Sequence, residues 1–238
     1  MNIGEIINDA LRYPFNNIKA FILYLILGIV AAIIGGTTVV TTIAAFRTKG
    51  LASITLSGIG IVEIIVFIIL MFLISGYALD IIRYGIERRN DGPGIDFGRQ
   101  IFNAVKLLVV DIVYYVVPCI IIFLLSLFLR SWIMTIIALI LFIVFALANF
   151  MAKCRLAKTE DIGYALAIGE AIGDISRVGL GKIIVIAILL FLVIFIILLL
   201  VGIIGALNDL IGDILLGFAL VYIIFFYNRA IGLLYSDL

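Results

Sequence analysis

The chain alternates between long apolar blocks and short polar segments. Six blocks are each long enough to cross a bilayer as a helix, which needs about 20 residues. None of them alternates apolar and polar side chains as a membrane-spanning barrel strand does. Helices satisfy their own backbone hydrogen bonds in lipid, so the blocks are predicted to be transmembrane helices. Their approximate bounds are 18–46, 59–84, 106–129, 131–153, 182–206 and 213–235.

Three of the polar segments are striped with the period of a helix. They contain "IGEIINDALR" from Ile3, "FGRQIFNAVK" from Phe97 and "IGEAIGDISR" from Ile168, and we expect the third helix to start near Glu160. In the second, for example, Ile101 and Phe102 lie on one face and Gln100 and Asn103 on another. Such stripes predict amphipathic helices that lie in the headgroup plane of the membrane.

Glycine and proline separate these helices from their neighbours. The turn "RRNDGPG" at residues 88–94 ends the preceding helix, and Asp96 is placed to cap the next one. Gly179 and Gly181 allow the chain to bend from the third amphipathic helix into the fifth span. Each of the three amphipathic helices is therefore predicted to lie at the membrane interface and to be followed by two spans.

The fold class that follows is an all-α integral membrane protein with six transmembrane helices. We expect a single membrane domain over residues 1–238 made of three parallel repeats, each an interfacial amphipathic helix plus a helical hairpin. The approximate repeat units are 1–90, 91–158 and 159–238.

Composition supports the membrane class, and charge gives an orientation. Of the 238 residues, 66% are hydrophobic and 13% are charged, whereas soluble domains carry about 25% charged residues. The positive-inside rule predicts a multi-pass protein of the cell membrane with both termini in the cytoplasm. The Lys and Arg residues on that side are Arg12, Lys19, Arg83, Arg88, Arg89, Arg99, Lys106, Lys153, Arg155, Lys158, Arg177, Lys182 and Arg229, against Arg47, Lys49 and Arg130 on the other.

Polar residues in or near the spans are the candidate functional residues, because ionisable groups are costly in lipid. Glu63 and Asp111 are the intramembrane ionisable candidates. A second set lies at similar depth near the cytoplasmic ends of the even-numbered spans. Its basic members either extend to the headgroups or belong to a polar ring that binds an anionic headgroup or lines a solute path. This set is Asp80, Arg83, Asn149, Lys153, Arg155, Asn228 and Arg229.

No constellation of catalytic residues stands out. The chain has no histidine, which removes the commonest metal ligand and general base. "VGLGKI" at residues 178–183 lacks the spacing and hydroxyl of a phosphate loop. Asp209 and Asp213 read as a solvated loop, or alternatively as a weak cation site that needs further oxygen ligands. We therefore predict no catalytic residues, metal, cofactor or nucleic-acid partner.

The segments "RYPFNN", "GYALDIIRYGIERRNDGPGIDFGRQIFNAVKLLVVDIVYYVVP" and "YNRA" resemble an archaeal family of multi-pass membrane proteins of unknown function, domain-of-unknown-function family 4013. The resemblance extends over nearly the whole chain. It implies a six-helix membrane domain and no established activity.

Three functions remain open from the sequence. The favoured one is a non-enzymatic membrane scaffold or lipid-interacting protein with a basic cytoplasmic face, whose partners are membrane lipids with anionic headgroups on the cytoplasmic leaflet. The alternative is a small-solute or ion transporter or channel that uses polar residues near the helix ends. A membrane enzyme acting on lipids is the least favoured. A protein partner or homo-oligomer stays open.

Overall fold

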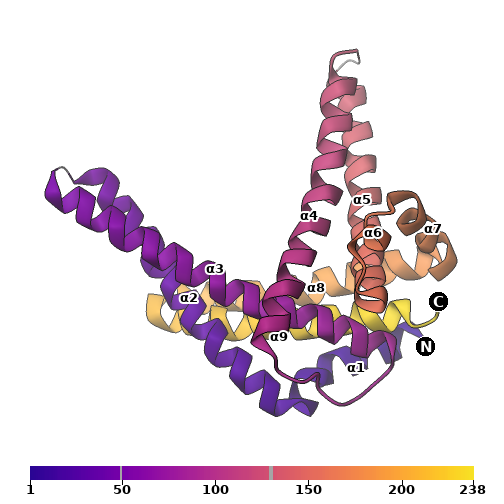
Figure 1. Cartoon of the computed structure of the whole chain (residues 1–238), viewed down its shortest axis with the longest axis horizontal. Coiled ribbons are helices and arrows are strands. Elements are labelled where there is room, and N and C mark those ends of the chain that lie inside the picture. The colour runs from indigo at the N-terminus through magenta and orange to yellow at the C-terminus, as the bar shows by residue number, and fades with distance from the viewer. Residues whose placement is uncertain (49, 129–130) are drawn as a thin grey trace.

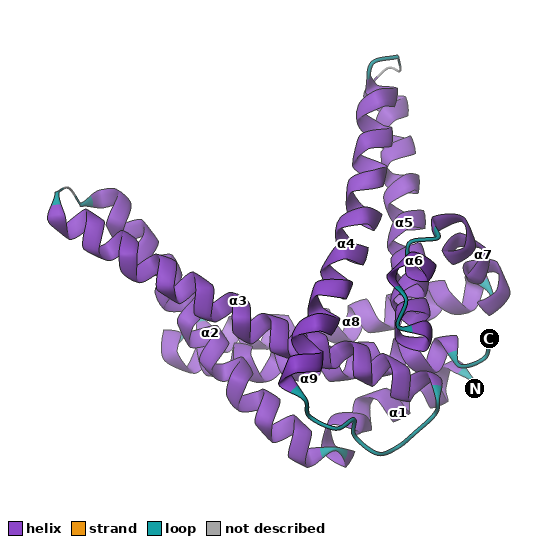
Figure 2. Cartoon of the chain, viewed as in Figure 1, coloured by secondary structure: helices purple, strands orange, loops and turns teal. Residues whose placement is uncertain are grey.

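The computed structural model describes residues 1–48, 50–128 and 131–238. In these ranges the regular elements are helices joined by short loops, and no strand occurs (Figure 2). The helices are α1 Ile3–Asn16, α2 Ile18–Arg47, α3 Leu51–Ile86, α4 Phe97–Ser126, α5 Ser131–Thr159, α6 Ile162–Ala165, α7 Ile168–Val178, α8 Leu180–Gly205 and α9 Asp209–Tyr235.

The predicted membrane class is confirmed by these helices. In the described part of the chain, six helices are long and apolar enough to cross a membrane, namely α2, α3, α4, α5, α8 and α9. Each corresponds to one predicted span, although α3 and α4 begin well before the predicted span and α5 ends well after it.

Short polar side chains begin several helices. Asn2 starts α1 with a capping box. The Asn2 side chain accepts from the Glu5 backbone amide at 2.8 Å, and the Glu5 side chain accepts from the Asn2 backbone amide at 2.9 Å. Asp96 accepts from the Arg99 amide at 3.1 Å, so the predicted cap of α4 is confirmed. Asn208 caps α9 in the same way. These caps satisfy amide groups that the helix itself leaves unpaired.

Both chain ends, α1, α6, α7 and the loop of residues 87–96 lie together at one end of the molecule, which we call the base (Figure 1). From there the α2–α3 hairpin and the α4–α5 hairpin extend in different directions (Figure 1). Helix α9 lies at the centre of the packing, against α1, α2, α3 and α8. The hairpin ends opposite the base are called the tips.

Glycine allows the helices to approach closely where they cross. A Cβ atom on Gly76 of α3 would lie 1.8 Å from the backbone oxygen of Gln100 in α4. Gly85 and Gly232 bring α3 against α9 in a similar way. Such contacts suit helix association in lipid, which depends on close packing rather than on the hydrophobic effect.

Two details of the predicted amphipathic helices are wrong. The second is not a separate helix, because α4 runs without a break from Phe97 into the span. The third does not run continuously from Glu160, because the chain breaks between α6 and α7. The predicted bend at Gly179 is confirmed by its positive φ of 99° between α7 and α8.

Candidate functional site

The apolar stripe of α1 packs against protein. Ile6 and Ala10 are fully buried in the main core cluster, and Glu5 and Arg12 on the opposite side are exposed. The stripe predicted from the sequence thus faces α9, since the two helices are in contact. This packing leaves little of the stripe free to enter a headgroup layer.

Arg229 of α9 is buried and completely engaged with the rest of the base. Its guanidinium forms an ion pair with Asp9 of α1 at 2.7 Å. It also donates to the backbone oxygens of Tyr84 at 3.1 Å and Arg89 at 2.6 Å, and to the side-chain oxygen of Asn90 at 3.3 Å. The side chain therefore joins α9 to α1 and to the end of α3.

Arg155 of α5 has the corresponding role near α7. It forms an ion pair with Asp174 at 3.0 Å and another with Glu170, and it donates to the Tyr164 backbone oxygen at 3.0 Å. Asp174 is itself only 1% exposed and also accepts from the Tyr235 hydroxyl at 2.9 Å. Asp174 therefore lies on the buried side of α7, between Arg155 and Tyr235.

Asp80 of α3 carries the negative charge in a third cluster. It accepts from Arg99 at 3.0 Å and from Asn103 at 3.2 Å, both in α4. Polar Gln100 is fully buried on the same helix, while Phe102 is 72% exposed. The stripe of this segment thus faces opposite to that of α1, with its polar side toward protein. Nearby, Arg83 forms ion pairs with Glu87 and Glu160.

The predicted polar ring is divided by the structure into separate places. Asp80, Arg155 and Arg229 hold three distinct clusters at the base, each linking an even-numbered span to another helix. Nine of the thirteen basic residues on this side form ion pairs within the described chain. Arg12 and Lys19 are exposed, with no ion pair to another described residue. The base is therefore less open to anionic headgroups than its count of cations suggests.

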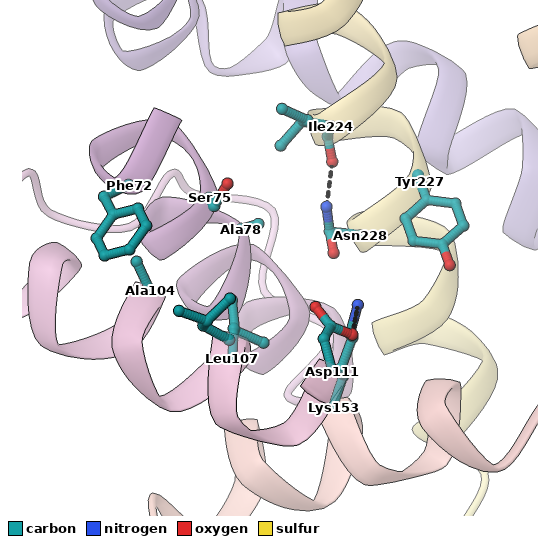
Figure 3. Close-up of a pocket in the computed structure, with 11 residues that line it drawn as sticks. Phe72, Ser75, Ala78, Ala104, Leu107, Asp111, Lys153, Ile224, Tyr227 and Asn228 are labelled. Atoms are coloured by element: carbon teal, nitrogen blue, oxygen red, sulfur yellow. Dashed lines mark hydrogen bonds and ion pairs between the residues drawn. The ribbon is translucent and has the colours of Figure 1, made fainter. Parts of the chain in front are cut away.

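Three further candidates, Asp111, Lys153 and Asn228, line a pocket between α3, α4, α5 and α9, and Asn149 bonds to one of them (Figure 3). Lys153 of α5 and Asp111 of α4 form an ion pair at 2.8 Å, and Asn149 donates to the same carboxylate oxygen at 2.8 Å. Asn228 of α9 donates to the Ile224 backbone oxygen at 2.7 Å. Its side-chain oxygen points toward the ion pair (Figure 3).

The pocket combines this polar end with apolar walls. Its volume is about 290 Å³. The Ser75 hydroxyl also lines it and makes no hydrogen bond to another described residue. The site can thus hold a small polar group next to hydrocarbon. The apolar lining consists of Phe72, Ala78, Ala104, Leu107, Leu108 and Ile224.

Glu63 lies in a different pocket near the tips, together with Asp209 and Asp213. This pocket has a volume of about 640 Å³ and is lined by α2, α3, α8 and α9. One carboxylate oxygen of Glu63 is buried without a hydrogen-bond partner. Asp209 and Asp213 belong to the first turns of α9, so the prediction of a loop there is wrong. Among the described residues, no group of His, Cys, Asp and Glu has an arrangement that could hold a metal ion.

Sequence reasoning did not identify Asp9 and Asp174 as the partners of Arg229 and Arg155. A signal was present, because the two carboxylates occupy the same position in "IGEIIND" and "IGEAIGD". The pairing of Asp111 with Lys153 had no comparable signal, since it depends on how α4 packs against α5.

The helices and the buried polar clusters define a polytopic α-helical membrane protein. Residues 59–206 match the family model described as "Protein of unknown function (DUF4013)", and the chain belongs to this family. The match does not extend over the N-terminal "RYPFNN" or the final "YNRA", so the predicted coverage of nearly the whole chain is wrong. No curated protein and no solved structure matches the chain.

Proposed function

We propose that this protein is a non-enzymatic, lipid-interacting protein of the cell membrane, with both termini in the cytoplasm. The observation that carries the proposal is the pocket lined by Asp111 and Lys153, which combines polar groups with apolar walls. A lipid offers the same combination, with a polar head and hydrocarbon tails. Pockets that bind small molecules are typically apolar with a few placed polar groups.

The position of the pocket supports a lipid that enters from the bilayer. Leu108 lines the pocket and is 45% exposed, and Ile112 one turn further along α4 is also exposed. Both side chains face the hydrocarbon if α4 spans the membrane. A tail can therefore leave the pocket directly into the surrounding lipid, without crossing a polar surface.

The basic face of the base supplies a second, weaker contact with lipid. Arg12 and Lys19 are exposed and lie close to the entry of α2. Each such cation near an anionic leaflet contributes about 1 kcal/mol of attraction. We assign any anionic headgroups to these two side chains, since Arg83, Arg155 and Arg229 are engaged within the protein.

Native mass spectrometry after minimal delipidation tests the proposal. The wild type should retain one lipid per chain. Leu108→Trp should lose that lipid, because the larger side chain fills the pocket that Leu108 lines. Leu124→Trp is the matched control, since Leu124 is 52% exposed on the same helix and does not line the pocket. A wild type without retained lipid, or equal retention by the Leu108 variant, would overturn the proposal.

A transporter or channel is the second candidate, and the pocket at the tips favours it. That pocket contains Glu63, Asp209 and Asp213, and a buried Glu63 oxygen without a partner. A proton or cation is the solute that three carboxylates suit. Flux into liposomes that contain the wild type, lost in Glu63→Gln, would establish this function. Absence of flux over a broad panel of ions and solutes would exclude it.

A further inference from the structure

The ion pair in the pocket between α3, α4, α5 and α9 leaves hydrogen-bonding capacity unused. Lys153 forms an ion pair with Oδ1 of Asp111, and Asn149 donates a hydrogen bond to the same oxygen. Oδ2 of that carboxylate accepts no hydrogen bond from a described residue. Lys153 has three N–H donors, and its ammonium group has this one ion pair among the described residues. A strong acceptor and a strong donor therefore lie side by side at the polar end of the pocket.

The charges in this pocket balance. Asp111 and Lys153 are the charged residues that line it. An anionic phosphate would compete with Asp111 for the ammonium group and would be repelled by the carboxylate. A cationic headgroup would meet the reverse conflict with Lys153. An uncharged headgroup meets neither, and charges without a partner in lipid are costly.

From this geometry we infer that the pocket binds a neutral lipid through a free hydroxyl group. The hydroxyl donates to Asp111 Oδ2 and accepts from Lys153 Nζ, because one hydroxyl can do both. Both hydrogen bonds involve an ionised partner, which makes them about twice as strong as bonds between neutral groups. The inference rests on the proposed lipid-interacting function and adds the chemical class of the lipid.

The remaining lining groups fit a headgroup with more than one oxygen. The side-chain oxygen of Asn228 points toward the ion pair (Figure 3), and the Ser75 hydroxyl has no partner among the described residues. A second hydroxyl or an ester oxygen beside the first can bond to these groups. The hydrocarbon then lies against Phe72 and Leu108. Glycerol lipids with an uncharged headgroup have this arrangement of oxygens and chains.

The test uses two lipids that differ only in the headgroup. The full chain is placed in phosphatidylcholine nanodiscs that contain a small fraction of either dioleoylglycerol or dioleoyl phosphatidic acid, and bound lipid is measured by native mass spectrometry. We expect the wild type to bind one dioleoylglycerol at least about tenfold better than the phosphatidic acid. Equal binding, or a preference for the phosphatidic acid, would overturn the inference.

Substitution of the carboxylate should reverse the selectivity. In Asp111→Asn the acceptor charge is lost and Lys153 is left unpaired, so the variant should prefer the phosphatidic acid. Asp213→Asn is the matched control, because Asp213 lies in the pocket at the tips and should leave the preference unchanged. An unchanged preference in Asp111→Asn would also overturn the inference.

A change in the lipid alone keeps the test valid if the Asp111 variant does not fold. Dioleoylglycerol with its hydroxyl methylated keeps the oxygen and loses the donor. Its binding to the wild type should fall about tenfold, since Asp111 Oδ2 is left without a donor. Undiminished binding would contradict the hydroxyl contact while leaving the proposed lipid-interacting function intact. Absence of every probe lipid from the wild type would instead contradict the proposed function.

Discussion

Arg229 combines nearly complete burial with a complete set of partners. It is 1% exposed, and its guanidinium bonds to Asp9 and to the chain at residues 84–90. Arg229→Ala leaves the Asp9 carboxylate and the Arg89 backbone oxygen without a donor among the described residues. We expect a loss of about 3–5 kcal/mol in the free energy of unfolding. Unfolding in mixed SDS micelles, followed by circular dichroism, measures it.

An exposed arginine of the same base provides the control for that measurement. Arg177 forms one ion pair with Asp174, and its side chain is 70% exposed. Arg177→Ala should cost less than about 1 kcal/mol, because solvent screens such pairs. Losses of equal size in the two variants would show that Arg229 does not hold the base together.

Asp237 gives the base a dependence on pH. Its carboxylate accepts from Lys182, from the Met1 amine at 3.1 Å and from Arg88 at 2.6 Å. The hydrogen bond from Lys182 is the main cause that lowers the pKa of Asp237 below its ordinary value of 3.8. Because the folded pKa is depressed, the ion pairs stabilise the fold above about pH 4. Their contribution is lost as the pH falls through the folded pKa.

The Asp237→Asn variant isolates this contribution. At neutral pH we expect it to be less stable than the wild type by at most about 1 kcal/mol, since the carboxylate is partly exposed. The difference should shrink toward zero as the pH falls through the lowered pKa of Asp237. Thermal unfolding of both proteins over this pH range measures it. A difference that is constant with pH would contradict the assignment.

At the scale of helices, the crossing of α3 and α4 depends on one glycine. The added methyl group in Gly76→Ala would lie 1.8 Å from the Gln100 backbone oxygen, so the helices must separate. We expect a loss of about 1–3 kcal/mol in the free energy of unfolding. Gly58→Ala on the same helix meets nothing within 4 Å and should be neutral or slightly stabilising. Equal effects in denaturant titrations of the two variants would contradict this account.

The spans could be predicted from the sequence because each is a long apolar block between polar residues. The parts of the helices that extend beyond these blocks could not be predicted in this way. The part of α4 that precedes the predicted span contains the polar residues Gln100 and Asn103. They are buried because α4 packs against α3, and this contact cannot be read from the sequence of α4. The break between α6 and α7 was also missed, since the sequence there keeps a helical stripe and the turn carries no proline.

The sequence identified the individual residues of the candidate site, but it did not show which of them lie together in the structure. Helical spacing along one segment shows which residues share a face, but it does not show which face meets another helix. Asp111 and Lys153 were thus assigned to different sets, although they form one ion pair. Arg155 and Arg229 were grouped with Lys153 by depth, whereas their carboxylate partners lie on α7 and α1.

At the scale of the whole molecule, polar contacts gather at the base and apolar surface dominates the tips. Ion pairs join the chain ends, α1, α7 and the loop after α3. The hairpins separate away from this base (Figure 1), and large side chains near their tips are exposed, such as Phe46 and Leu207, each 85% exposed. Such surface is stable next to lipid and costly in water.

This polarity predicts that the base and the tips lie on opposite sides of the membrane, with the base in the cytoplasm. Single cysteines test it in a background with Cys119→Ser and Cys154→Ala. Leu207→Cys lies at a tip, and Gly94→Cys lies in the exposed loop of the base. A membrane-impermeant maleimide should label the first on intact cells and the second only after permeabilisation. The reverse pattern would show that the base lies outside the cell. Labelling of both positions on intact cells would place them on the same side of the membrane, which contradicts an odd number of crossings between them.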